Sequence, residues 1–451
     1  MSAASAAIAI ILGLVALAAL AGLYLAWRGL RRYAGMACAF AAKTVCSGLF
    51  VAGRPLASLR AEELGLNQPA ALGLCRIRVD PHRQLVRASF PGIVARRAAC
   101  RHGLGSALVM ETSLQALRAQ ARPNNPPNNP PQDDWPSGAV NPQALEHAFD
   151  EADPARPQRS RAAVVLHRGE LLAERYAAGF GADTPQLGWS LSKTALGLLI
   201  GAAVRQGYLA LDDGRLLPEW RGDERSEITL RQLLQMRGGQ AWAEDYGSSQ
   251  SEVMQMLFAT AHTARYAVAR PLAHAPGSHW CYSSGGSNVL SRVLQQALGD
   301  ERYADWPRRA LFAPLQLASA VFEADADGLF TASSYMYASA RDWARIGQFM
   351  LQDGVWRGER LLPEGWMDFC TSPAPGSGGE YGAHLWLQLG DWGPRGSPPL
   401  PADAFHAVGH EGQFISVLPG DELVVVRLGL TRYAGSWNQA AFIDRVRRDL
   451  R

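Results

Sequence analysis

Ser190 and Lys193 stand three positions apart and are the first candidates for covalent chemistry. Residues with this spacing lie on one face of a helix, so the serine hydroxyl and the lysine amine can meet. Serine is a poor nucleophile until a base removes its proton. A buried lysine can be that base, because burial disfavours the ammonium and lowers its pKa. The spacing therefore predicts a serine activated by a lysine.

The composition of the chain singles out this lysine. Of 44 lysine and arginine residues, only Lys43 and Lys193 are lysines. Arginine stays protonated and cannot act as a base, so a lysine retained at position 193 suits the predicted role. The alternative is that Ser190 or Ser192 caps a helix and Lys193 is a surface charge. A positive charge at a helix N-terminus is unfavourable, which counts against this alternative.

Two more candidates lie further along the chain. Tyr282 opens a Tyr-Ser-Ser-Gly run, and a tyrosine beside a lysine ammonium can carry a proton to a leaving group. Segment 409–413, Gly-His-Glu-Gly-Gln, leads into an expected strand, where a glycine permits close approach to the backbone. The alternatives are a packed tyrosine and a bulge glycine beside a surface histidine. His406 and His410 have the spacing of helical zinc ligands, but the glycines around them disfavour a helix, and no metal site is expected.

In chain order, Ser-x-x-Lys, Tyr-x-Ser and His-x-Gly resemble the motifs of the penicillin-recognising serine hydrolases. That superfamily includes class C β-lactamases, DD-peptidases, family VIII carboxylesterases and 6-aminohexanoate-dimer hydrolase. Segment 228–234 resembles its "ITIRHLL" helix. Blocks 242–246, 276–285 and 337–343 are most similar to the 6-aminohexanoate-dimer hydrolase branch. The resemblance covers residues 141–451.

The resemblance implies a role for each matching residue. Ser190 would be the acylated nucleophile, Lys193 its general base and Tyr282 a proton shuttle. The activity expected is hydrolysis of a small-molecule ester or amide through an acyl-serine intermediate, with neither a metal nor an organic cofactor. The alternatives are a membrane-tethered DD-peptidase or penicillin-binding-like protein, and a non-catalytic binding protein with the same fold.

The resemblance also suggests the lining of the site. His410 and Gly412 would line it in place of a Lys-Thr-Gly strand, and the backbone N–H groups of Gln413 and the nucleophile would form the oxyanion hole. Ser284 and Tyr246 are expected to contact substrate. Ser284 replaces the asparagine of β-lactamases and His410 replaces their lysine. Both changes remove groups that hold a β-lactam, so a small ester or amide is the better expected substrate.

The secondary-structure pattern after residue 141 predicts one large α/β (α+β) unit. Hairpins are expected at its two ends, at 162–176 and 414–428. Between them, helices are expected at 194–204, at 228–235 with a Thr229 cap, and from Asn288. Another helix is expected to start near residue 141, and a last one near Trp437. The two ends would form one antiparallel sheet flanked by helices, with an all-helical insertion.

The chain begins with an apolar segment. Residues 3–27 include no charged side chain and exceed the roughly 20 residues that span a bilayer. We predict a transmembrane anchor over residues 1–35 rather than a signal peptide, which would carry a basic start. A cleaved signal and a buried core helix are the alternatives. Arg28 and its neighbouring arginines favour a cytoplasmic domain. The resemblance favours an extracytoplasmic, periplasmic one, which is the side expected.

Residues 36–122 are expected to form an accessory region with a β-hairpin over 75–90. A Pro/Asn-rich connector at 123–140 would join it to the catalytic unit at 141–451, the alternative being a surface loop inside one domain. Six cysteines include no CxxC pair. A Cys75–Cys100 bridge and buried free thiols both remain open.

The overall composition excludes two broad classes of protein. Of the 451 residues, 48% are hydrophobic, which excludes wholesale disorder. The net charge is only +3, which gives no basis for nucleic-acid binding. The expected partners are therefore a small-molecule substrate and, through the N-terminal helix, a membrane. The oligomeric state is left open.

Overall fold

A five-stranded antiparallel sheet, with strand order β12-β13-β14-β5-β6, forms the centre of the unit expected over residues 141–451, called the catalytic unit after its expected role. The computed structural model describes residues 3–120, 142–151, 153–390 and 397–450. The strands are β5 (Ser160–His167), β6 (Glu170–Tyr176), β12 (Phe405–Gly409), β13 (Gln413–Leu418) and β14 (Leu423–Gly429). Strand β14 pairs with β5, so the two ends of the unit meet in one sheet. Both predicted hairpins, and the sheet that joins them, are confirmed.

Alternation along the central strands separates two apolar layers. Val164 and Val426 belong to the larger core cluster, while their neighbours Val165 and Val425 belong to a smaller one. Successive strand residues point to opposite faces, so a continuous apolar run fits a sheet covered on both sides. Helix α10 (Ala340–Leu351) covers the first face and α12 (Gln439–Asp449) the second. The sheet therefore has no face left open to solvent along these strands.

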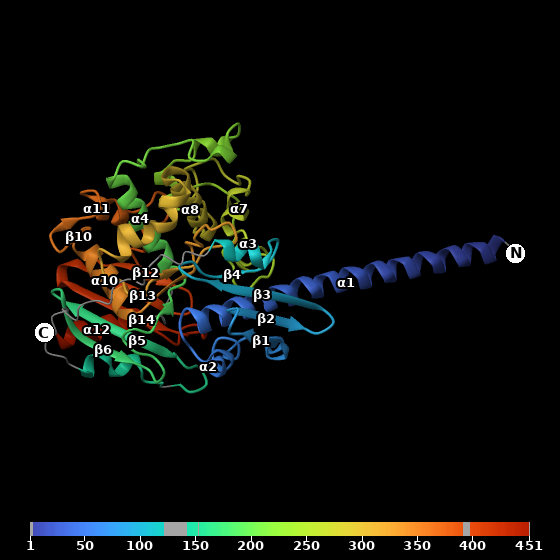
Figure 1. Cartoon of the computed structure of the whole chain (residues 1–451), viewed down its shortest axis with the longest axis horizontal. Coiled ribbons are helices and arrows are strands. Elements are labelled where there is room, and N and C mark those ends of the chain that lie inside the picture. The colour runs from blue at the N-terminus through green and yellow to red at the C-terminus, as the bar shows by residue number, and fades with distance from the viewer. Residues whose placement is uncertain (1–2, 121–141, 152, 391–396, 451) are drawn as a thin grey trace.

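Most of the helices lie between β6 and β12 in the chain and form the upper layer in Figure 1. They are α4 (Leu191–Arg205), α5 (Leu230–Leu234), α6 (Glu252–Phe258), α7 (Thr263–Val268), α8 (Ser284–Leu298), α9 (Asp300–Pro307), α10 and α11 (Trp366–Thr371). Short strands also occur in this region. They are β7 (Gln186–Leu187), β8 (Val321–Phe322), β9 (Met336–Ala338), β10 (Val355–Trp356) and β11 (Glu359–Arg360). The insertion expected to be all-helical is thus helical with two small sheets.

Side-chain caps fix where two of these helices begin. Thr229 and Gln232 form a reciprocal capping box at the start of α5, at the predicted cap. Helix α8 begins at Ser284, four residues before the predicted start, because the Ser283 side chain accepts a hydrogen bond from Gly286 N at 2.9 Å. Gly285 is required there, since a Cβ would lie 2.4 Å from the Trp242 ring. Close packing against Trp242 therefore explains Gly285, a glycine that resembles a loop residue in sequence.

Helix α1 (Ala3–Phe50) contains 48 residues and projects far from the body of the molecule (Figure 1). Residues 10–33 are exposed, and burial begins at Ala34. The helix is long and apolar enough to cross a membrane, a property that a signal sequence shares. It continues without a break across the boundary expected at residue 35. The candidate membrane segment and the accessory region thus share one helix.

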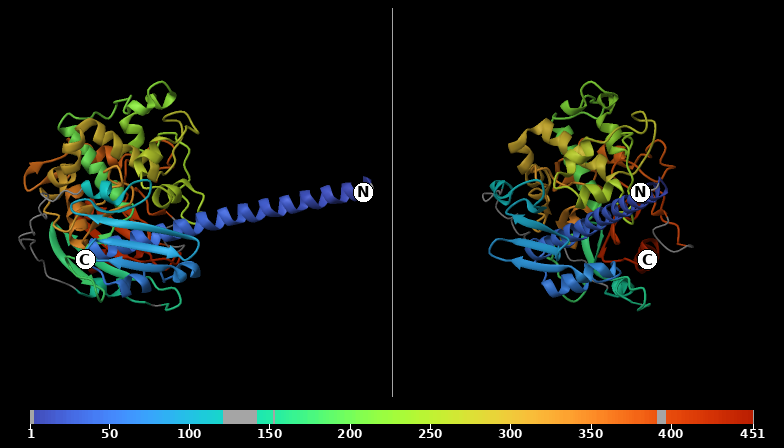
Figure 2. Two further views of the ribbon diagram at one scale, coloured as in Figure 1. Left: turned by 45° about the vertical axis from the view of Figure 1, so that its right-hand side comes forward. Right: turned by 90° about the vertical axis from the view of Figure 1, so that its right-hand side faces the viewer.

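The accessory sheet lies against the buried half of α1, alongside the catalytic unit (Figure 2). Its strand order is β1-β2-β3-β4, with β1 (Arg76–Asp80), β2 (Leu85–Phe90), β3 (Val94–Arg101) and β4 (Gly105–Leu108). The predicted hairpin is confirmed as β1 and β2. Small side chains on both elements, such as Ala42 and Ala98, are fully buried and permit close packing. Helices α2 (Leu56–Ala61) and α3 (Leu114–Ala119) complete this region.

The structure answers the question of the cysteines, whereas the connector lies outside its described residues. All six cysteines are free thiols, and Cys75 Sγ lies 3.8 Å from Cys38 Sγ rather than bonded to Cys100. The connector 123–140 and Asn141 lie outside the described residues. The short 3-10 helix η2 (Pro142–Ala148) follows, near the predicted helix start.

Candidate active site

The N-terminus of α4 brings Ser190 and Lys193 together. Ser190 precedes the helix, and Lys193 Nζ lies 2.8 Å from Ser190 Oγ. The amine also donates to Ser284 Oγ at 2.9 Å and to the Ser333 carbonyl at 3.1 Å. Lys193 is only 1% exposed, and burial lowers its pKa to about 8. An amine with this pKa loses its proton near pH 8, well below the pH at which an exposed lysine does.

The chain before Ser190 is held in a constrained conformation. Trp189 has a positive φ of 48°, which is uncommon for a residue other than glycine. Gly188 has no space for a side chain, because a Cβ would lie 2.4 Å from the Trp343 ring. Gly188 N donates to Met336 O at 2.9 Å, and Met336 N donates to Ser192 Oγ at 2.9 Å. These bonds join the start of α4 to β9 and fix the position of Ser190.

Tyr282, the expected proton shuttle, lies beside Lys193 and Ser190. Its ring centroid lies 4.9 Å from Lys193 Nζ. Burial raises the pKa of the Tyr282 hydroxyl above its ordinary value, and a hydrogen bond with Ser190 partly opposes that rise. The ring packs against Tyr381 and Trp386, with centroid distances of 5.8 and 5.3 Å. The phenol is therefore neutral and has a fixed position beside the serine.

Glu244 belongs to this site although the sequence analysis did not select it. Its carboxylate accepts hydrogen bonds from the Ser284 hydroxyl, from Ser284 N at 2.9 Å and from Trp242 Nε1 at 2.6 Å. A chain of hydrogen bonds thus runs from Lys193 through Ser284 to Glu244. The negative charge of Glu244 favours the Lys193 ammonium and so opposes the effect of burial on its pKa. In the sequence, the resemblance of block 242–246 to the hydrolase branch was the one feature that could have pointed to Glu244.

Aromatic rings form one wall beside Ser190. Tyr246 and His410 stack with centroids 4.6 Å apart and an interplanar angle of 13°. Both rings meet Trp189 edge to face, at 6.2 and 5.3 Å. Burial lowers the pKa of His410, so its imidazole is neutral at neutral pH. Tyr246 and His410, predicted separately, therefore occupy one apolar surface together with Trp189, the residue before Ser190.

The turn between β12 and β13 meets the segment before Ser190. A Cβ on Gly409 would lie 2.3 Å from the Gly188 carbonyl oxygen, so this contact requires glycine. The buried Gln413 side chain donates to His410 O at 3.1 Å and to Gly429 O at 2.7 Å, which holds the turn. Gly412 has a φ of 82° and faces Arg427, so its observed role is to shape the turn.

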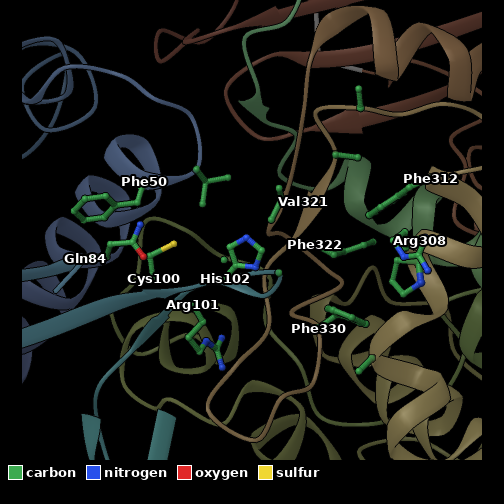
Figure 3. A pocket seen from close by; sticks show the side chains of 17 residues that line it. Phe50, Gln84, Cys100, Arg101, His102, Arg308, Phe312, Val321, Phe322 and Phe330 are labelled. Carbon is green, nitrogen blue, oxygen red and sulfur yellow. The ribbon is translucent and has the colours of Figure 1, made fainter. Parts of the chain in front are cut away.

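A separate cavity of about 340 Å³ lies between the accessory region and the catalytic unit (Figure 3). Phe50 and Cys100 line one side and Phe312 and Phe322 line the other. None of the candidate site residues lines this cavity. Among the described residues, no group of three or more His, Cys, Asp or Glu side chains could hold a metal ion.

Residues 146–440 match the family model described as Beta-lactamase. The chain belongs to the beta-lactamase family. The match begins at η2 and ends in α12, so it includes the whole five-stranded sheet and every candidate site residue. The accessory region and α1 lie outside it.

Relatives of this family member include hydrolases. The 6-aminohexanoate-dimer hydrolase of Paenarthrobacter ureafaciens is 30% identical over 217 residues, which cover 46% of the chain and 55% of that protein. The chain thus matches about half the length of that relative.

Solved structures share the fold. A Bacillus anthracis protein, provisionally assigned as a 6-aminohexanoate-dimer hydrolase, superposes with a TM-score of 0.57 and 20% identity, covering 72% of this chain and 88% of that one. EstCE1, a hydrolase with promiscuous acyltransferase activity, superposes with a TM-score of 0.53 and 17% identity, covering 68% and 96%. At these identities the likeness concerns the fold alone.

Proposed function

We propose that this beta-lactamase family member hydrolyses a small ester or amide, with Ser190 as the acylated nucleophile. One observation carries the proposal: a buried lysine whose pKa is lowered to about 8 lies 2.8 Å from the Ser190 hydroxyl. Lys193 is then the general base. Tyr282, fixed beside both residues, is the group that passes a proton to the leaving group.

Acylation follows from this arrangement in one balanced step. The Ser190 proton moves to Lys193 Nζ as Ser190 Oγ bonds to the substrate carbonyl carbon. The backbone N–H groups of Ser190 and Gln413 stabilise the resulting oxyanion, assisted by the positive end of α4. Collapse of the intermediate expels the alcohol or amine, which receives a proton through Tyr282. A water molecule, deprotonated in the same way, then releases the acid and restores Ser190.

The hydrogen bonds around Lys193 suit its change of charge. The ammonium formed during acylation finds three acceptors, in Ser190, Ser284 and the Ser333 carbonyl. The Ser284 hydroxyl donates its hydrogen bond to Glu244, so its oxygen has lone pairs free to accept from the lysine. Buried charge is expensive without such partners. We therefore assign Ser284 and Glu244 to stabilisation of the protonated base.

The aromatic wall supports a substrate of low polarity beside the scissile bond. Tyr246, His410 and Trp189 offer ring faces and edges, and the His410 imidazole is neutral. A neutral ring at position 410 gives no cation for a substrate carboxylate. This supports a neutral ester or amide over a β-lactam.

We also propose that α1 anchors the enzyme in a membrane with its catalytic unit on the extracytoplasmic side.

Intact-mass measurement with a fluorophosphonate tests the proposed nucleophile. The full chain in detergent is expected to gain one adduct, mapped to Ser190, and Ser190→Ala is expected to gain none. Ser278→Ala, at an exposed serine, is the matched control and should react like the parent protein. A folded parent protein without an adduct, or a variant at position 190 that still reacts, would refute the assignment. A long-lived penicillin adduct would instead favour the DD-peptidase alternative.

A further inference from the structure

Lys43, the second of the two lysines, is also buried. It lies on α1, is 5% exposed and forms an ion pair with Glu323, which is 1% exposed. Ser47, one turn further along α1, receives a hydrogen bond from Lys43 at 3.0 Å and donates one to Glu323 at 2.9 Å. Ser106 N in β4 also donates to Glu323 at 2.7 Å. Glu323 directly follows β8, so this cluster joins the accessory region to the catalytic unit.

Glu323 and Lys43 together hold the segment 331–335. Thr331 N donates to Glu323 O at 3.0 Å, and Glu323 N donates to Tyr335 O at 2.8 Å. Both ends of the segment are therefore bonded to one residue. The Lys43 ammonium lies 3.9 Å from the centre of the Tyr335 ring, a cation–π contact in a dry environment. Lys43 thus contacts the segment directly and also through its ion pair.

The same segment contacts the proposed catalytic base. Its middle residue, Ser333, accepts a hydrogen bond from Lys193 Nζ through its carbonyl at 3.1 Å. Asn288 in α8 donates to Ser333 Oγ at 2.9 Å. The Tyr335 ring contacts the Trp189 ring at 6.2 Å, immediately before the nucleophile. A continuous path of contacts therefore joins the two lysines, from Lys43 through the Tyr335 ring and along the chain to the Ser333 carbonyl.

We propose that Lys43 is a positioning residue of the active site, acting through Glu323 and the segment 331–335 to hold the Ser333 carbonyl against Lys193. The inference rests on the proposed function of Lys193 as the base. It gives α1 a second role besides that of a candidate membrane segment: one of its residues orients the catalytic lysine. The family match does not include Lys43, so this device belongs to the N-terminal extension of this chain.

Lys43 and Glu323 carry opposite charges, so the test includes a variant in which both are replaced. Removing Lys43 alone leaves the Glu323 carboxylate buried without its counter-charge, which loosens the cluster. Water then enters beside Lys193, and the unpaired negative charge favours its ammonium. Both effects raise the pKa of Lys193. In Lys43→Met with Glu323→Gln the pair itself carries no charge, and the glutamine can still accept from Ser106 N.

The test compares pH profiles of p-nitrophenyl acetate hydrolysis by the full chain in detergent. Lys43→Met is expected to lower kcat about tenfold, leave KM within about twofold, and move the acid limb of kcat/KM up by about half a pH unit. The double variant with Glu323→Gln is expected to return the limb to the parent position. Leu117→Ala, a buried residue of α3 outside the cluster, is the control for stability. It should lower the melting temperature without moving the limb.

Each outcome of this test decides the inference. If Lys43→Met melts earlier, as Leu117→Ala does, yet keeps the parent kcat and pH profile, Lys43 is structural only and the proposal is overturned. If Lys43→Met does not fold, Ser47→Ala replaces it, since it removes the hydroxyl between Lys43 and Glu323. A smaller shift in the same direction supports the proposal, and an unmoved limb overturns it. If the Lys193→Arg variant keeps the full activity of the parent protein, the proposed function of Lys193 is contradicted instead.

Discussion

The Lys193 amine lies 2.9 Å from Ser284 Oγ, and Ser284 in turn donates to Glu244. Through this relation a carboxylate influences the proposed base without touching it. The negative charge of Glu244 favours the Lys193 ammonium, so Glu244→Gln is expected to lower the pKa of Lys193. The acid limb of kcat/KM should move to lower pH by about half a unit. Glu252→Gln, at a carboxylate that accepts from Ala243 N at 3.0 Å and lies 3.9 Å from Arg270 Nη1, is the control. A limb that stays in place, or moves up, contradicts this prediction.

Lys193 should control the pH dependence of the parent enzyme. Only its neutral form can accept the Ser190 proton, and its pKa is lowered to about 8. The rate of p-nitrophenyl acetate hydrolysis should therefore be low in acid and rise as pH passes through about 8. Lys193→Arg cannot lose its proton, and kcat should fall between about 100-fold and 10,000-fold. A flat profile between pH 6 and 9 would show that another group is the base.

Gly409 should tolerate no larger residue. A Cβ at this position would lie 2.3 Å from a backbone oxygen, which cannot rotate away. Gly409→Ala is expected to destabilise the fold by about 1–3 kcal/mol and to displace Gln413 from the nucleophile, so kcat falls as well. Thermal melting and ester hydrolysis measure the two effects. Gly181→Ala, where an added Cβ meets only Thr184 Oγ1 at 3.9 Å, should leave both unchanged. Equal behaviour of the two variants would refute the contact.

Truncation should separate the two halves of α1. Removing residues 1–33 leaves the buried part of the helix, which begins at Ala34, in place, so the remaining chain should fold and keep its esterase activity. Removing residues 1–50 also removes Lys43 and uncovers apolar side chains of the accessory sheet, such as Val86. That shorter chain is expected to aggregate. Circular dichroism and size-exclusion chromatography distinguish the two results, and a folded chain from residue 51 onward would disprove the role of α1 in the core.

Local patterns in the sequence were sufficient for the central sheet and for the pair at the start of α4. Strands β5, β13 and β14 are mostly apolar, β6 alternates between exposed and buried residues, and each hairpin has turn residues between its strands, so pairing within each hairpin follows from local sequence. Ser190 and Lys193 are one helical turn apart, and their proximity needs no tertiary information. Tyr282 was placed by its motif, and the structure positions its ring beside Lys193.

Contacts between distant segments account for what the sequence analysis missed. Glu244 acquires its place through Ser284, which is 40 positions away, and a carboxylate in a loop has no local mark of that contact. The start of α8 was placed too late because Gly285 resembles a loop residue until its contact with Trp242 is known. Alanine and cysteine residues along the second half of α1 continue the apolar composition of the first half. Composition therefore did not reveal where the helix enters the core.

Helix α1 has one consequence for the way the enzyme would meet its substrates. The helix is unbroken from Ile10 to Phe50, and no loop separates its exposed part from its packed part. A Gly- or Pro-rich tether would let a domain swing through a volume that grows with its length. A stiff rod fixed at both ends allows almost none of that movement. In an anchored molecule, Ser190 would therefore stay at a nearly constant distance from the bilayer and in a nearly constant orientation. Such an enzyme would act on compounds that come within this distance of the membrane surface.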